Sequence, residues 1–195
     1  MKFKNRPNLR HELPDGRVIW ESRSVAVNGV ILATIKDNID DVYILCSKRG
    51  PAVEDLPGLM NLVAGYMDWD ETGPEAFIRE CWEEVGLNIY DIVLDKKYKV
   101  LQSNLIQPWT VVTEPNQNKQ NISLRYGLVF EAESVEDLPE LSLEHNEVVG
   151  EAEDPMWLPL SQFQSYPNWA FGHDHVIINY LNEAILRDVI HLSKD

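Results

Sequence analysis

The 195-residue sequence predicts an α/β fold in which a mixed sheet packs between two helices. Residues 25–35 and 42–47 are apolar and β-branched, and the turn-rich stretch between them is typical of a β-hairpin. A capped helix is expected over residues 73–85, and apolar residues recur with a helical period over 175–190. Strand-like segments lie on both sides of the first helix and the second helix closes the chain, so the expected architecture is an α/β sandwich.

The composition is that of one globular domain spanning residues 1–195, with residues 1–24 as a polar N-terminal arm. Hydrophobic residues make up 44% of the chain and charged residues 25%, so a core can form without a disulfide or metal staple. A short strand is expected in the arm around residues 17–20. The sequence contains neither an internal repeat nor a low-complexity segment.

The charge balance excludes several classes of partner. With 17 Lys+Arg and 32 Asp+Glu the formal net charge is −15, and no run of basic residues could form a phosphate-binding patch. We therefore expect no nucleic-acid partner and no membrane partner, since no stretch approaches the ~20 apolar residues of a membrane span. Cys46 and Cys81 lack zinc-ligand spacing and are expected to be buried thiols in a reducing compartment, so the expected location is the cytoplasm.

The remaining elements follow from local patterns. They are a Gly- and Pro-rich loop at 48–58, strands at 61–67, 89–105 and 122–133, a polar connection at 113–121, an irregular acidic segment at 134–155 and a short apolar run at 157–160. The three strands would extend the sheet begun by the hairpin.

Capping residues mark both ends of the central helix. Thr72 can cap the first turn while Glu75 reaches back to it, and Pro74 stands where a missing N–H does no harm. Gly86 stands where a helix C-terminus is expected. These signals bound the helix at residues 73–85.

One face of this helix is strongly acidic. At about 100° per residue, Glu80, Glu83 and Glu84 fall within an arc of about 100° and are expected to form one exposed cluster. The apolar side is filled by Cys81, Val85, Ile78 and Trp82. Three like charges repel one another, and Mg²⁺ relieves such repulsion because it prefers oxygen ligands and bridges carboxylates to phosphates. The alternative is a solvated acidic face on an acidic protein.

The residues around the three glutamates form a longer motif. Gly65 is followed after five residues by Glu71, and seven residues later the stretch 79–87 reads RECWEEVGL. In this spacing the sequence resembles the complete Nudix box of the Nudix hydrolase superfamily. The resemblance implies a Nudix-type α/β/α sandwich over about residues 24–190. It also implies a pyrophosphohydrolase that cleaves a nucleoside diphosphate linked to another moiety, with a small-molecule nucleotide as substrate and Mg²⁺ or Mn²⁺ as cofactor.

The resemblance assigns metal-binding roles within the box. Glu83 and Glu84 would be the principal metal ligands, and Glu80 would be a further ligand or the general base. Gly65 would be a ligand through its carbonyl oxygen, and the absence of a side chain lets the backbone approach an ion. The ion would lower the pKa of a bound water, which then attacks phosphorus.

The resemblance also implies an orienting ion pair between Arg79 and Glu71. Glu71 stands just before the helix N-terminus, where a negative charge is favourable, and Arg79 is placed two turns further on. Because the net charge of −15 would repel a polyanionic substrate from the bare site, we expect strict dependence on a divalent ion.

Outside the box, the resemblance implies one more acidic residue from a later loop, as a metal ligand or base. The candidates are Glu144, Glu147, Glu151 and Glu153, and the sequence does not choose among them. Arg49 follows the second predicted strand, and the resemblance implies that it faces substrate phosphates, the alternative being a surface cation.

Shorter resemblances bear on the substrate. Ala64-Gly65 and Gln107-Pro108-Trp109 resemble parts of NADH diphosphatases, although residues 110–112 diverge and no zinc-binding cysteines precede the domain. The segment 170–175 (AFGHDH) resembles one that opens the last helix in some ADP-ribose-related Nudix proteins, and its His173, Asp174 and His175 are expected to cap and pack rather than bind metal. Trp109 is a candidate substrate-binding residue, and at most one of Trp69, Trp109 and Trp169 is expected to stack on a base.

Two classes of function remain open. The favoured one is the enzyme, and the other is a regulatory Nudix-fold domain that binds a nucleotide without cleaving it. Such domains generally lose box glutamates, whereas this chain keeps every box residue. A homodimer is expected only because many family members form one.

Overall fold

The structure is a computed structural model that describes residues 9–21, 24–116, 119–146 and 148–190. Over these residues it consists of a two-stranded sheet, an eight-stranded sheet and three α-helices joined by loops and short 3₁₀ turns. None of the helices in this part of the chain combines the length and apolar character needed to span a bilayer.

The eight-stranded sheet is mixed, as predicted. Its central path runs β10 (Ala152–Pro159), β4 (Asn38–Arg49), β3 (Ser24–Ile35), β9 (Lys119–Ala132) and β7 (Lys99–Ser103). The strands that pair outside this path are β5 (Met60–Asn61) with β4, β6 (Ala64–Tyr66) with β3 and β8 (Thr110–Asn116) with β9. β3 and β9 run parallel, whereas β3 and β4 form the predicted antiparallel hairpin. The long central strand β3 therefore has neighbours on both sides.

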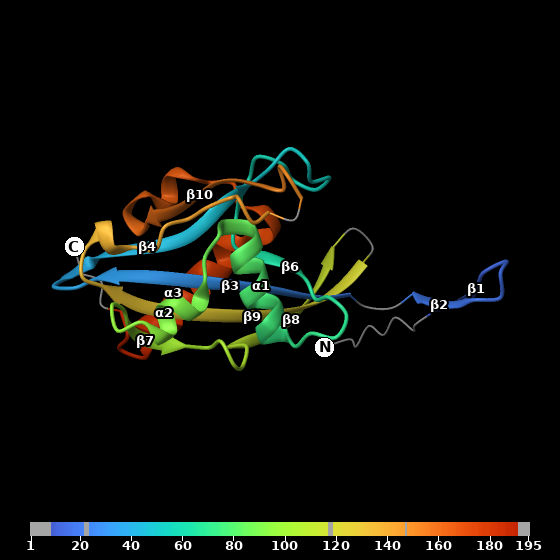
Figure 1. Cartoon of the computed structure of the whole chain (residues 1–195), viewed down its shortest axis with the longest axis horizontal. Helices are drawn as coiled ribbons and strands as arrows, with labels where there is room; N and C mark the ends of the chain where they lie inside the picture. Colours follow the sequence, from blue (N-terminus) through green and yellow to red (C-terminus); the bar gives the residue numbers. More distant parts are fainter. Residues whose placement is uncertain (1–8, 22–23, 117–118, 147, 191–195) are drawn as a thin grey trace, which may run out of the picture.

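The helices form two layers around the sheet. α1 (Gly73–Val85) and α2 (Ile89–Leu94) cover one face, and α3 (His173–Leu186) covers the other (Figure 1). The prediction of an α/β sandwich is confirmed.

Alternate residues of β3 feed the two apolar cores. Val27 and Ile31 pack in the core that includes Phe77 of α1, while Val30 packs in the core that includes Tyr180 of α3. Successive side chains of a strand point to opposite faces of the sheet, and here both faces are covered. This is why residues 25–35 are apolar at nearly every position rather than at every second one.

The central helix begins and ends where its caps predict. The backbone N–H of Thr72 donates to Glu75 Oε2 at 2.8 Å, which closes the capping box. Gly86 has φ 68°, the left-handed conformation that glycine adopts without strain, and its N–H donates to the Trp82 carbonyl. The helix bounds of 73–85 are confirmed.

The prediction of one strand over residues 89–105 was wrong in its first half. Residues 89–94 form α2, and β7 begins only at Lys99. Asn88 caps α2 by accepting a hydrogen bond from the Tyr90 N–H at 3.1 Å. Ile89 and Ile92 are buried at a helical spacing of three residues, so packing overrides the β-branched preference of this segment.

The polar stretch 113–121 is also different from the expected connection. It lies largely within a hairpin of β8 and β9, in which Thr113 is paired with Ile122. Backbone ladder bonds do not depend on apolar side chains, so polarity was a poor guide there. Smaller differences are that strand 61–67 is split into β5 and β6, that β10 begins at residue 152, and that the last helix spans 173–186.

The N-terminal arm contains a second, smaller sheet. β1 (Leu9–Glu12) and β2 (Val18–Glu21) form an antiparallel hairpin, of which only the second strand was expected. Figure 1 shows this hairpin at one end of the molecule, away from the eight-stranded sheet.

Both cysteines are buried free thiols, as predicted. Cys46 lies in β4, and burial raises the pKa of its thiol to about 12. Cys81 lies on the buried side of α1, where burial likewise raises the thiol pKa. Neither thiol is a nucleophile at neutral pH, because the thiolate is the reactive form.

Candidate active site

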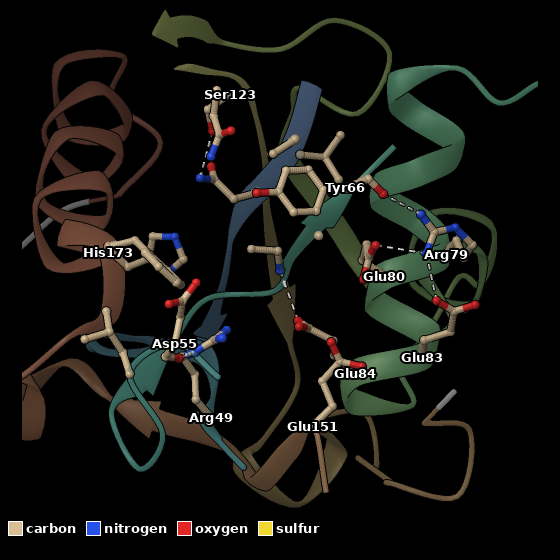
Figure 2. A pocket seen from close by; sticks show the side chains of 18 of the residues that line it. Arg49, Asp55, Tyr66, Arg79, Glu80, Glu83, Glu84, Ser123, Glu151 and His173 are labelled. Atoms are coloured by element: carbon tan, nitrogen blue, oxygen red, sulfur yellow. Dashed lines mark hydrogen bonds and ion pairs between the residues drawn. The ribbon is translucent and has the colours of Figure 1, made fainter. Parts of the chain in front are cut away.

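A pocket of about 720 Å³ opens between α1, the start of β3, and the loops around residues 49–56, 151 and 171 (Figure 2). One side of it carries Glu80, Glu83, Glu84 and Glu151, and the other carries Arg49, Asp55 and His173. Tyr66 lies between the two sides in this view. The pocket therefore has an acidic wall facing a wall with a cation.

The acidic wall is more buried than the sequence predicted. Glu80 and Glu84 are only 8% and 6% exposed, so the expectation of one exposed carboxylate cluster was wrong. They are covered because β6 (Ala64–Tyr66) crosses in front of the acidic face of α1. Trp82, placed on the apolar side by the wheel, is 41% exposed and stacks on His145 with ring centroids 3.8 Å apart.

Arg79 holds three of the box glutamates. Its Nε and Nη2 donate to the two oxygens of Glu71 at 3.1 and 2.9 Å, a bidentate pair of the kind expected for an orienting bridge. Its Nη1 donates to Glu80 at 2.9 Å and to Glu83 at 2.8 Å. Nη2 also donates to the Tyr66 carbonyl at 3.0 Å, which ties α1 to β6.

Glu84 and Gly65 complete the acidic wall. The Ala64 N–H donates to Glu84 Oε2 at 3.0 Å, so β6 fixes that carboxylate. A Cβ on Gly65 would overlap the carboxylate of Glu80, which explains why glycine is needed at this close approach. The carboxylates of Glu80 and Glu84 thus both lie against the backbone of β6.

The charged forms of the two buried carboxylates are costly. Burial raises the pKa of Glu80 to about 7, even though the Arg79 guanidinium beside it acts in the opposite direction. Burial, with Glu80 nearby, raises the pKa of Glu84 well above its usual range. In contrast, the hydrogen bond from Arg79 lowers the pKa of Glu71. The site as described lacks enough positive charge for Glu80 and Glu84, and this favours a further cation.

The carboxylates are not arranged around one point. Glu80 and Glu83 turn toward Arg79, and Glu84 turns toward Ala64. Consistent with this, the described part of the chain has no group of three acidic, histidine or cysteine side chains set around a common ion position. A shared cation would require Glu80 and Glu83 to rotate away from the guanidinium.

Of the four acids proposed outside the box, the structure brings Glu151 to the pocket. Its charge also raises the pKa of Glu80 and of Glu84, although more weakly than burial does. Glu144 and Glu153 are exposed outside the pocket, and Glu147 lies outside the described residues.

The pocket lining that the structure describes contains none of the three candidate tryptophans. Trp109 packs against Tyr180 with centroids 5.4 Å apart, and its indole N–H donates to the Tyr126 carbonyl at 3.2 Å. Trp169 is buried in the α3 core, and Trp69 is exposed on the loop before α1. The structure therefore does not bring Trp109 to the substrate side of the site.

Arg49 does line the pocket, where the sequence placed a phosphate-facing cation. Its Nε donates to the Asp55 carbonyl at 2.7 Å, and its guanidinium carbon lies 4.9 Å from the ring centroid of Phe171. Phe171 and Asn28 also line the pocket, and neither was predicted from the sequence as a lining residue. Asn28 carried a sequence signal, because its amide interrupts the apolar run of β3. In the structure this amide is buried and donates to Ser123 Oγ at 3.1 Å.

His173 is a neutral, buried acceptor. Its Nδ1 accepts a hydrogen bond from the Leu62 N–H at 3.1 Å, whereas His175, two residues further on, is exposed. Burial, assisted by Arg125 and Arg49, lowers the pKa of His173 to about 3. The expectation that this segment packs rather than binds metal agrees with the hydrogen bond to Leu62.

This burial predicts a defined pH dependence of stability. Below pH 6.5 the unfolded chain protonates His173 while the folded chain does not, so the histidine destabilises the fold as the pH falls from 6.5 toward 3. In His173→Asn, the amide oxygen can still accept from Leu62 but does not titrate. We expect the stability of the variant relative to wild type to improve by about 2 kcal/mol between pH 7 and pH 5. Urea unfolding at both pH values measures this, and a pH-independent difference would contradict it.

The sandwich, and a helix that brings three glutamates and an arginine to one pocket, define the class of Nudix pyrophosphohydrolases. The chain belongs to the Nudix family, because residues 25–180 match the family model of the NUDIX domain. The sequence-based prediction of a Nudix enzyme of this class is confirmed. No curated protein matches the chain by sequence.

Solved structures share the fold at low sequence identity. The NUDIX domain of Shewanella oneidensis NrtR, complexed with ADP ribose, is 14% identical with a TM-score of 0.59 over 84% of this chain and 89% of that chain. A bifunctional NMN adenylyltransferase/ADP ribose pyrophosphatase from Francisella tularensis, complexed with AMP and a Mn ion, is 23% identical with a TM-score of 0.57 over 83% and 42%. A C. elegans Ap4A hydrolase is 12% identical with a TM-score of 0.55 over 84% and 98%.

Proposed function

We propose that this enzyme hydrolyses the pyrophosphate linkage of a nucleoside diphosphate joined to another moiety, with a divalent metal ion as cofactor. The observation that carries the proposal is that the carboxylates of Glu80, Glu83 and Glu84 line one side of the pocket and the guanidinium of Arg49 lines the opposite side. A diphosphate needs cations along its length, and this pocket offers one arginine and a set of oxygen ligands for another cation.

The residues present fit Mg²⁺ or Mn²⁺. The available donors are carboxylate oxygens of Glu80, Glu83 and Glu84 and the carbonyl oxygen of Gly65, and hard divalent ions prefer such all-oxygen sets. The raised pKa values of Glu80 and Glu84 support the fit, because a cation would favour the ionised forms that burial disfavours.

In the proposed mechanism a divalent ion held in this pocket would supply a cation that lowers the pKa of a water and neutralises phosphate oxygens. Glu83 and Glu84 would be its principal ligands, and the absence of a side chain at Gly65 would leave room for the backbone oxygen. Glu80 or Glu151 accepts the proton of the attacking water, since both line the pocket on the side of the ligands. Arg79 and Glu71 keep α1 against β6, and Arg49 meets the phosphate across the pocket.

For the substrate, we propose a dinucleotide or nucleotide sugar of the ADP-ribose or NADH type. Two of the fold relatives are complexed with ADP ribose or AMP, and the pocket volume of about 720 Å³ is in the range that holds ligands of this size. The two buried, free cysteines support a reducing, cytoplasmic location for the enzyme. A homodimer stays a prediction.

The test is a substrate panel with and without metal. We expect Mg²⁺ or Mn²⁺ to support hydrolysis of at least one of ADP-ribose, NADH, nucleotide sugars, dinucleoside polyphosphates, CoA and nucleoside triphosphates. Excess EDTA should abolish turnover and restored metal should recover it, because the acidic wall lacks its cation without metal. Product formation would be followed by chromatography. Appreciable turnover in excess EDTA would contradict the proposed metal-dependent mechanism.

A further inference from the structure

The wall of the pocket opposite α1 holds two apolar residues in a left-handed backbone conformation. Among the described residues, six non-glycine residues have positive φ, and four of them are aspartates, which tolerate it. The other two are Leu56 at φ 55° and Phe171 at φ 54°, and both line the pocket. Bulky side chains are strained there, and such strain persists where the surroundings over-determine it, typically at ligand sites.

The strain at Phe171 sets the direction of its ring. Phe171 and Gly172 both have left-handed dihedrals, and α3 begins immediately afterwards at His173. This backbone places the ring over Arg49, 4.9 Å from the guanidinium carbon. The ring edge meets His173 with centroids 5.8 Å apart, and His173 is itself fixed by the Leu62 N–H.

Arg49 is consequently held from two directions. Its Nε–H is bonded to the Asp55 carbonyl on one side, and the Phe171 ring covers the guanidinium from another. An arginine side chain loses conformational entropy when it binds an anion. Contacts that already hold the guanidinium before binding reduce that loss. The held guanidinium lies across the pocket from Glu84 and Glu151 (Figure 2).

We propose that Phe171 is a positioning residue whose ring holds the Arg49 guanidinium in the orientation that contacts a phosphate group of the substrate. The inference rests on the proposed function and deepens it, because it names the group that prepares the phosphate contact. In this proposal the left-handed backbone at residue 171 serves to place the ring on Arg49.

The first test separates binding from chemistry. Phe171→Leu removes the ring but leaves the backbone strain, and we expect it to raise KM about fivefold, a typical cation–π contribution, with kcat changed by less than about twofold. Phe171→Tyr keeps a ring face and should retain a KM close to wild type. The matched control is Phe163→Leu, which truncates a phenylalanine packed on Trp169 in the α3 core and should leave KM unchanged.

The second test asks whether Phe171 acts through Arg49. In an Arg49→Met background, where the cation is lost, Phe171→Leu should raise KM no further. Phe171→Gly, which relieves the left-handed strain, should unfold at a temperature equal to or above that of Phe171→Leu, while its KM is raised as much. A merely structural ring would instead give parallel losses of stability and affinity. That result, or additive effects of Phe171→Leu and Arg49→Met, would overturn the inference.

A binding measurement makes the inference independent of turnover. AMP has no pyrophosphate to cleave, so its Kd can be measured by calorimetry with Mg²⁺ present. We expect Phe171→Leu to weaken AMP binding about fivefold and Phe171→Tyr to preserve it. Failure of wild type to bind AMP, or equal Kd for wild type and Phe171→Leu, would overturn the inference. AMP binding without hydrolysis of any panel member would overturn the proposed function instead.

Discussion

Glu83→Gln is expected to lower kcat for pyrophosphate hydrolysis at least about 100-fold, since even residues that only support metal ligands commonly contribute 10- to 100-fold. The amide is nearly isosteric but neutral, so it would be a poorer ligand for a hard divalent ion. The fold should survive, because Glu83 lies at the pocket surface of α1, where it accepts a hydrogen bond from Arg79, and the apolar face of the helix is unchanged. Initial rates at saturating Mg²⁺ and thermal unfolding measure the two effects.

Glu75→Gln is the matched control on the same helix. Glu75 belongs to the capping box with Thr72, and glutamine can replace glutamate in that motif. The kcat of Glu75→Gln should equal that of wild type, and its free energy of unfolding should change by less than about 0.5 kcal/mol. If Glu83→Gln retained most of the wild-type kcat, the assignment of Glu83 as a metal ligand would fail. If Glu75→Gln were equally inactive, loss of a glutamate from α1 would be damaging for reasons unrelated to metal.

The sequence predicted the parts of the site that depend on local spacing. Thr72, Glu75 and Gly86 define the ends of α1 through bonds within a few residues, so the bounds of that helix could be read directly. The resemblance of residues 65–87 to the Nudix box likewise implied an ion pair between Glu71 and Arg79, and the structure shows it as a bidentate bridge. Such features need no knowledge of the rest of the fold.

Features that depend on distant segments could not be predicted in the same way. A helical wheel shows that Glu80 and Glu84 share a face, but their burial results from β6 lying across that face. Glu151 could not be chosen from four acids, because its position depends on how the loop before β10 returns to the pocket. The strained Phe171 carried no sequence signal beyond its place before the last helix.

The second large effect is expected for Arg79→Gln, which should reduce the free energy of unfolding by about 2–3 kcal/mol without metal. The change removes the guanidinium that pairs with Glu71, Glu80 and Glu83, and leaves partly buried carboxylates facing one another. Mg²⁺ should then stabilise the variant more than wild type, because the carboxylates of Glu80 and Glu83 no longer have to leave the guanidinium to bind the ion. Urea unfolding with EDTA and with saturating Mg²⁺ measures both quantities.

Arg187→Gln provides the comparison for an exposed ion pair. Arg187 pairs with Glu183 at 2.7 Å at the end of α3, on the opposite side of the sheet from α1. Because exposed pairs four residues apart contribute little, the expected loss is about 0.5 kcal/mol or less and should not respond to Mg²⁺. A similarly small loss in Arg79→Gln would mean that the glutamates of the acidic wall are stabilised mainly by water. An equal Mg²⁺ increment in wild type and Arg79→Gln would mean that Arg79 and the metal do not compete for Glu80 and Glu83.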